Sequence, residues 1–177
     1  MSELTLKPRG TEEPKSNTIS NIFNWIRYIS LLLIIFLIFR YVVGITIVSG
    51  NSMNPTLKNN DLILTSNIFF NVDRGDIVIV QDPHGFDIIK RVIALPNETI
   101  EIKSGIAYVD DVPLQEDYIL GKSFDLEKTT IPEGSYFIMG DNRTPGESLD
   151  SRDESIGPVP SAAVKGQKLI SLFPFSL

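Results

Sequence analysis

A serine and a lysine are the residues of this chain whose types could do chemistry together. Ser52 follows a long apolar run, and Lys90 follows two isoleucines in a strand-like sequence. A serine hydroxyl is a poor nucleophile until a base removes its proton. Histidine is the usual base, but the single histidine of the chain, His84, lies in a turn-like sequence. Because serine–lysine pairs are a known variant of the nucleophile–base arrangement, Ser52 and Lys90 indicate a serine hydrolase that needs no histidine.

Composition limits the class of protein. The chain has 177 residues, of which 42% are hydrophobic, and a net charge of −6. This length is enough for one domain and a membrane anchor, and the negative charge argues against nucleic acid as a partner. The chain has no cysteine, which excludes disulfides, zinc–thiolate sites and a cysteine nucleophile. The acidic residues lack metal-ligand spacing, so the sequence implies neither a metal nor a cofactor.

One apolar segment, residues 28–48, is long enough to cross a membrane. A helix of this length, at about 1.5 Å per residue, spans a hydrocarbon core of about 30 Å. Arg40 is its one charged residue, and from its position past the centre the side chain can reach the outer headgroups. Aromatic residues suited to the membrane interfaces are Trp25, Tyr28 and Tyr41. We therefore predict a cytoplasmic tail over residues 1–27 and a transmembrane helix over residues 28–48.

Basic residues around the apolar segment predict its orientation. Those before it are Lys7, Arg9, Lys15 and Arg27, whereas a comparable window after it contains Lys58 alone. The positive-inside rule then puts the N-terminus in the cytoplasm and residues 49–177 outside, in a single-pass protein of the cell membrane. A cleaved secretory signal is the alternative. The apolar run exceeds the usual length of such a signal, and cleavage near its end would leave Ser52 at a frayed N-terminus.

Beyond the anchor the sequence pattern favours strands. Short β-branched runs bounded by turn residues cover residues 61–65, 76–80, 87–95, 135–139 and 168–172. A hairpin is expected where Ser104 and Gly105 separate two further runs, residues 98–103 and 106–109. No later window keeps a period of 3.6 residues. We therefore expect a mainly β fold, an antiparallel β-sheet catalytic domain over residues 49–177 behind one N-terminal transmembrane helix.

Several stretches of this domain resemble the sequence boxes of type I signal peptidases. Residues 49–57 (SGNSMNPTL) are similar to the nucleophile box, residues 74–80 (RGDIVIV) to the central strand box, and residues 90–96 (KRVIALP) to the lysine box. Residues 139–143 (MGDNR) and 148–152 (SLDSR) resemble the two halves of the last box. The boxes follow the family's order behind an N-terminal span, and the short chain resembles the Gram-positive single-span form.

The resemblance implies that Ser52 and Lys90 are the catalytic residues of a Ser–Lys dyad. Ser52 would attack the carbonyl carbon of a peptide bond, and Lys90 would be the general base. Lysine has an ordinary pKa of about 10.4, so it can be a base only where burial lowers that value, for example to about 8. The backbone N–H of Ser52 would stabilise the oxyanion, and Gly50 would allow close approach of the backbone.

The resemblance also implies a set of supporting residues. Ser148 would hydrogen-bond the lysine amine and orient it. Arg91 with Asp141, and Asp150 with Arg152, would form two supporting ion pairs; exposed surface charge is the plain alternative for the second pair.

The chain departs from the family pattern in three places, one of which is two extra residues before Gly157. Residues 94–98 read ALPNE where the family commonly has Gly-Leu-Pro-Gly-Asp, and Asn97 can keep the turn because asparagine tolerates positive φ. Residues 144–147 (TPGE) lengthen the segment between the two halves of the last box. We expect the insertion to form a longer loop beside the site.

The resemblance implies exported preproteins as substrates, cut after signal peptides with small residues at the first and third positions before the bond. The lipid bilayer is the second expected partner, and Met53 suits either a lipid-facing surface or the core. The sequence does not define an oligomeric state. Other functions left open are a non-catalytic assembly chaperone, for example for surface pili, a soluble-type self-cleaving Ser–Lys regulator, and a membrane-tethered binding module.

Overall fold

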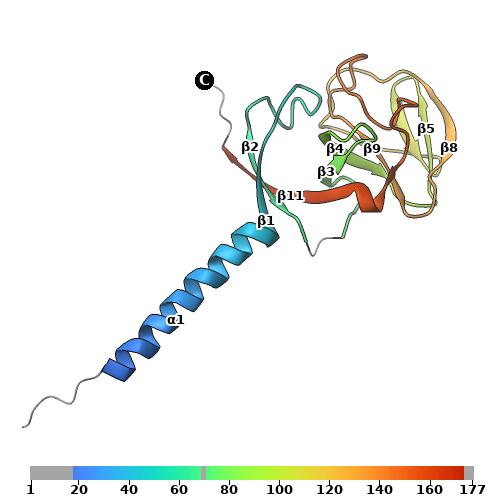
Figure 1. The fold of residues 1–177 in the computed structure, drawn as a ribbon. Coiled ribbons are helices and arrows are strands. Elements are labelled where there is room, and N and C mark those ends of the chain that lie inside the picture. The colour runs from blue at the N-terminus through green and yellow to red at the C-terminus, as the bar shows by residue number, and fades with distance from the viewer. Residues whose placement is uncertain (1–17, 69–70, 174–177) are drawn as a thin grey trace, which may run out of the picture. The chain divides into compact units, whose positions relative to one another are not determined.

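The computed structural model describes residues 18–68 and 71–173, which divide into two units (Figure 1). The first unit contains the helix α1 (Thr18–Leu37), and the second begins at Ile38 with one turn of π-helix, η1 (Ile38–Val42). The strands all belong to the second unit. The predicted combination of one N-terminal apolar helix and a mainly antiparallel β fold is confirmed.

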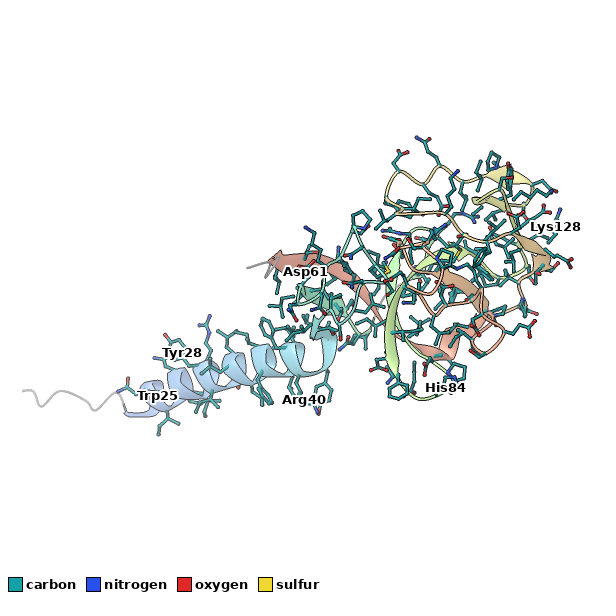
Figure 2. All side chains as sticks on the ribbon, turned by 90° about the horizontal axis from the view of Figure 1, so that it is seen from above. Trp25, Tyr28, Arg40, Asp61, His84 and Lys128 are labelled. Carbon is teal, nitrogen blue, oxygen red and sulfur yellow. The ribbon has the colours of Figure 1, made fainter. Side chains whose placement is uncertain are left out.

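The helix α1 is apolar on all sides over residues 31–37, whereas its first half includes Asn21, Asn24 and Arg27. Its side chains from residue 21 onward are exposed, and Figure 2 shows Trp25 and Tyr28 projecting from it. Because a helix that is hydrophobic on all sides needs an apolar environment, this surface fits lipid. Asn21–Val42, 22 residues, is the one segment in the described part of the chain that is long and apolar enough to cross a membrane.

The bounds of the apolar segment differ from the predicted span. The helix begins at Thr18, within the predicted tail, and Val43–Ile47 forms the strand β1. The prediction that the helix extends to residue 48 is therefore wrong. The strand β1 pairs antiparallel with β2 (Leu62–Ser66), which satisfies backbone groups that a helix would otherwise pair internally. Its β-branched residues suit a strand as well as an apolar helix.

The larger sheet has seven strands in the order β1-β2-β11-β3-β4-β9-β10. Its remaining strands are β3 (Ile77–Gln81), β4 (Asp87–Ala94), β9 (Ser135–Met139), β10 (Val159–Pro160) and β11 (Val164–Phe173). A single 3-10 turn, η2 (Ser161–Ala163), precedes β11. The strand β11 lies between β2 and β3 (Figure 1), so the C-terminal strand joins the first part of the sheet to the strands that carry the lysine.

The smaller sheet has four strands in the order β7-β6-β5-β8. They are β5 (Thr99–Lys103), β6 (Ile106–Val109), β7 (Val112–Pro113) and β8 (Leu126–Thr130). The predicted hairpin is confirmed, and its turn uses positive φ at Ser104 (53°) and Gly105 (84°). The strand β8 has no alternating apolar pattern and was not predicted, because it is an edge strand whose side chains are mostly exposed.

Buried apolar residues form three clusters. One cluster joins the smaller sheet to the ends of β4 and β9, and a second lies around Val78, Val92 and Ile138. The third contains Met53 and Leu57, which are 1% and 0% exposed. Burial of each such side chain contributes about 1.5–3 kcal/mol. Met53 therefore packs in the core, and the turn that carries Ser52 is anchored on its inner side.

Candidate active site

Ser52 lies in a tight turn after β1. The amide of Asn54 donates to the carbonyl of Asn51 over 3.1 Å, and that of Leu57 donates to the carbonyl of Met53 over 2.9 Å. With Met53 and Leu57 buried, the half-buried Ser52 is held on a turn that cannot move freely.

Gly50 enters this turn with a φ of 95°, a conformation that glycine adopts at no steric cost. A Cβ at this position would meet no atom within 4 Å, so the backbone angle rather than space explains the glycine. Its amide donates to Asn59 Oδ1 over 2.9 Å.

Lys90 lies on β4, opposite Val78 of β3, and is 4% exposed. Its amine Nζ donates a hydrogen bond to Ser52 Oγ over 2.7 Å. The two candidate catalytic residues are therefore in direct contact. A neutral amine could accept the serine proton over the same distance, which is the geometry that a nucleophile and its base require. His84, by contrast, is exposed in the turn between β3 and β4 (Figure 2).

Burial lowers the pKa of Lys90 to about 8. The negative charges of Asp150 and Asp141 raise the pKa, and the positive charge of Arg152 lowers it, but burial is the largest influence. At neutral pH a fraction of the lysine is then uncharged, whereas an exposed lysine would be almost fully protonated. The value agrees with what a lysine base would need.

Asp150 is the centre of a buried hydrogen-bond network. Its carboxylate accepts bonds from Ser148 Oγ (2.6 Å), the Gly140 amide (2.9 Å) and Arg152 Nε (2.8 Å) and Nη2 (2.7 Å). Burial would raise the pKa of Asp150, but the hydrogen bond and charge of Arg152, with Ser148 and Gly140, hold it below its ordinary value. The Ser148 hydroxyl donates to Asp150, and the hydrogen bonds of the described residues include none between Ser148 and Lys90.

Arg91 and Asp141 form the second expected pair. Arg91 Nε and Nη2 donate to Asp141 Oδ1 and Oδ2 over 2.8 and 2.6 Å, so the contact is bidentate. The Asp141 side chain is 0% exposed. Arg91 Nη1 also donates to the carbonyl of Gly75 over 2.7 Å, and the ring of Tyr118 lies 4.0 Å from its Cζ. This network holds the residue next to Lys90.

Three residues of the last box that the sequence reasoning did not single out also contact the site. A Cβ on Gly140 would collide with the Ser148 side chain and with the carbonyl of Ser52, so only glycine fits there. The Asn142 amide donates to that Ser52 carbonyl over 2.9 Å. Arg143, with a side chain 0% exposed, donates from Nε to the Gly140 carbonyl over 2.8 Å. The sequence feature that could have identified them is their position beside Asp141 in residues 139–143 (MGDNR).

The inserted segment lies beside this site, as expected. Thr144, Pro145 and Gly146 line a pocket of about 180 Å³ together with Ser148, Arg152 and residues 124–126. Within residues 18–68 and 71–173, no group of three or more histidine, aspartate or glutamate side chains is arranged to hold a metal ion.

Known proteins share this chain's sequence over nearly its whole length. Residues 22–173 match the family described as "Signal peptidase, peptidase S26". The chain belongs to that family. "Signal peptidase I" of Bacillus licheniformis is 30% identical to it, with the match covering 94% of this chain and 96% of the relative. "Probable signal peptidase I-1" of Synechocystis sp. is 36% identical over 73% of this chain and 70% of the relative.

A solved signal peptidase I structure is similar as well. The crystal structure of a signal peptidase I from Enterococcus faecalis matches 56% of this chain and 98% of its own chain, with 34% identity and a TM-score of 0.50. Membership of the signal peptidase family makes the chain a serine peptidase of the class that removes signal peptides. With one apolar N-terminal helix, it is a single-pass membrane protein.

Proposed function

We propose that this protein removes N-terminal signal peptides from exported preproteins with a Ser52–Lys90 dyad, at the membrane that its helix crosses. The observation that carries the proposal is the 2.7 Å contact between Lys90 Nζ and Ser52 Oγ, made by a buried lysine whose pKa is about 8. A nucleophile and base in contact, in a family of signal peptidases, support this chemistry over a non-catalytic role.

The proposed reaction has two halves. In the first, neutral Lys90 takes the Ser52 proton while Oγ attacks the carbonyl carbon, and the resulting ammonium protonates the leaving amine. In the second, water attacks the acyl-enzyme and Lys90 takes the water proton. The resulting ammonium then protonates Ser52 Oγ as the acyl group leaves. The Ser52 amide is not a donor in the hydrogen bonds of the described residues, so it can stabilise the oxyanion.

The supporting residues act on this pair through position and charge. Ser148 and Asp150 lie against Gly140, which in turn lies against the Ser52 carbonyl. Asp141 and Arg91 fix the strand position next to Lys90. Gly50 shapes the entry to the nucleophile turn. We assign these residues supporting roles and reserve the chemical steps for Ser52 and Lys90.

The substrate follows from the short chain distance between the anchor and the serine. The apolar segment ends at Val42, and the chain from Val42 to Ser52, even if fully extended, keeps Ser52 within about 35 Å of that end. Bonds held near the membrane surface, such as the junction after an apolar signal, can reach such a site. The proposed substrates have small residues before the cut. The proposed location is the cell membrane, with the N-terminus in the cytoplasm and the catalytic domain outside.

The decisive experiment measures cleavage of a preprotein with an Ala-X-Ala junction by the full-length protein in detergent with lipid. Wild type should cut at the junction, and Ser52→Ala and Lys90→Ala should lose activity by about a thousandfold or more. Lys103→Ala is the matched control, because this lysine has a side chain 63% exposed on the smaller sheet.

Each other outcome points elsewhere. Absence of cleavage by folded wild type, with several preproteins and up to pH 9, would favour the assembly chaperone. Cleavage that survives Lys90→Ala would support the peptidase activity but show that Lys90 is not its base.

A separate experiment tests the orientation in the membrane. Protease added to sealed vesicles digests the catalytic domain only where that domain lies on the outside.

A further inference from the structure

The loop between β7 and β8 places two side chains next to the candidate site, although no motif marks them. Glu116 has a side chain 5% exposed and accepts hydrogen bonds from both terminal nitrogens of Arg143. The Arg143 side chain is itself 0% exposed. A buried arginine needs a counter-charge, so Glu116 is the residue that permits Arg143 to lie under the Gly140 carbonyl.

Tyr118 connects the same loop to the strand that carries Lys90. Its ring covers the Arg91 guanidinium at 4.0 Å, and its hydroxyl donates to Glu116 Oε1 over 2.9 Å. Burial and the neighbouring Glu116 raise the pKa of Tyr118 above its ordinary value, so the hydroxyl remains a donor. Arg91 is therefore held by Asp141 through its nitrogens and by Tyr118 against its flat face.

Backbone contacts fix the loop in place. The Leu120 amide donates to the Asp141 carbonyl over 2.9 Å, and the Arg143 amide donates to the Leu120 carbonyl over 2.7 Å. Gly121 then turns the chain with a φ of 78°, and a Cβ there would lie 3.0 Å from the Thr144 amide nitrogen. The loop thus forms a short parallel bridge with the last box, beside the residues that contact Ser52.

We propose that Glu116 and Tyr118 are positioning residues for the Ser52–Lys90 pair. Tyr118 holds Arg91, which is next to Lys90 in sequence. Glu116 holds Arg143, which donates a hydrogen bond to Gly140, and Gly140 lies against the Ser52 carbonyl. The inference rests on the proposed function, because it concerns the reaction of that pair.

The charges around Lys90 make this role measurable. The charged groups acting on its amine are Asp150, Arg152 and Asp141, and the carboxylate of Asp141 raises its pKa. Arg91 offsets the charge of Asp141 through the bidentate contact. If Arg91 loses the Tyr118 ring and moves, Asp141 acts more strongly on Lys90. The acid limb of the rate profile then moves to higher pH, which loss of stability alone would not cause.

The test compares Tyr118→Leu with Tyr118→Phe in the full-length protein, with the preprotein as substrate. Tyr118→Leu removes the aromatic face and should lower kcat about tenfold while KM changes by less than about twofold. Its acid limb should lie at higher pH than that of wild type. Tyr118→Phe keeps the ring over Arg91 and should lose much less activity. Tyr108→Leu is the matched control, because Tyr108 is a half-buried tyrosine of β6 in the smaller sheet.

Glu116→Gln gives a second variant, which keeps the side-chain shape and removes the counter-charge of Arg143. It should lower kcat as well, and a thermal melt separates this from unfolding. NMR titration of the Lys90 side chain in wild type and Tyr118→Leu reads the pKa change without any turnover. Folded Tyr118→Leu with a wild-type kcat and an unchanged Lys90 titration would overturn the inference. A wild type that never cleaves preproteins would refute the proposed function instead, and the titration would still test the positioning role.

Discussion

The amine of Lys90 lies 2.7 Å from the hydroxyl of Ser52, although 38 residues separate them in the chain. Lys90 is fixed by the pairing of β4 with β3, and Ser52 by a turn whose inner side chain, Met53, is buried. Both residues therefore depend on rigid surroundings rather than on flexible loops, which is what a preorganised nucleophile and base require.

The first prediction concerns the pH dependence of wild-type activity. Lys90 acts as a base only when neutral, and its pKa is about 8. We expect kcat to rise about tenfold between pH 7 and 9 and then to level off, because the neutral fraction rises from about a tenth to about nine tenths. Single-turnover rates across this range measure it. A flat profile with chemistry rate-limiting would contradict the assignment of Lys90.

The second prediction uses the charges next to Lys90. Asp150 raises its pKa and Arg152 lowers it. Asp150→Asn should therefore move the acid limb of the rate profile to lower pH, and Arg152→Met should move it to higher pH. Each variant should also lower kcat about tenfold, because the network around Ser148 is disturbed.

The opposite signs provide the control for this pair. A disturbance of packing alone would move the acid limbs of both variants in the same direction, or would leave both unchanged. The assignment of these charges would be wrong if Asp150→Asn and Arg152→Met shifted the limb alike.

The third prediction concerns the close approach at Gly140. Gly140→Ala places a methyl group against the Ser52 carbonyl and the Ser148 side chain. It should destabilise the fold by about 1–3 kcal/mol and lower kcat by about tenfold or more even in the folded fraction. Gly166→Ala is the control, because its Cβ would lie 2.9 Å from the Ser66 carbonyl in β2 and would not contact Ser52. That variant should lose stability and keep its kcat; equal losses of kcat would contradict the prediction.

The fourth prediction concerns stability. Folded Lys90 has a pKa of about 8, against 10.5 for the ordinary side chain. Between these values the unfolded chain binds more protons than the folded one, so stability rises with pH. The free energy of unfolding of wild type, relative to Lys90→Met, should increase by about 3 kcal/mol from pH 8 to pH 10.5. Denaturant unfolding of both proteins in the same detergent measures it, and parallel curves would show that Lys90 is not held neutral.

Residue types and local patterns predicted the parts of this protein that depend on short segments. The apolar helix, the hairpin around Ser104 and Gly105, and most strands of β-branched residues, though not β1, were predicted, because length, turn chemistry and alternation are local properties. Family membership was predicted as well, since it rests on motifs read directly from the chain.

Long-range pairing decided the rest. Residues 43–47 suit a helix or a strand equally, and only the presence of β2 made them β1. The strand β8 has no local signal and forms because β5 offers it an edge.

The same reason explains the residues around the site. Ser148 bonds to Asp150, and Glu116 and Tyr118 reach Arg143 and Arg91, because folding brings distant segments together. A sequence determines which groups are available, but their partners are set by which surfaces pack, and that depends on the whole chain at once.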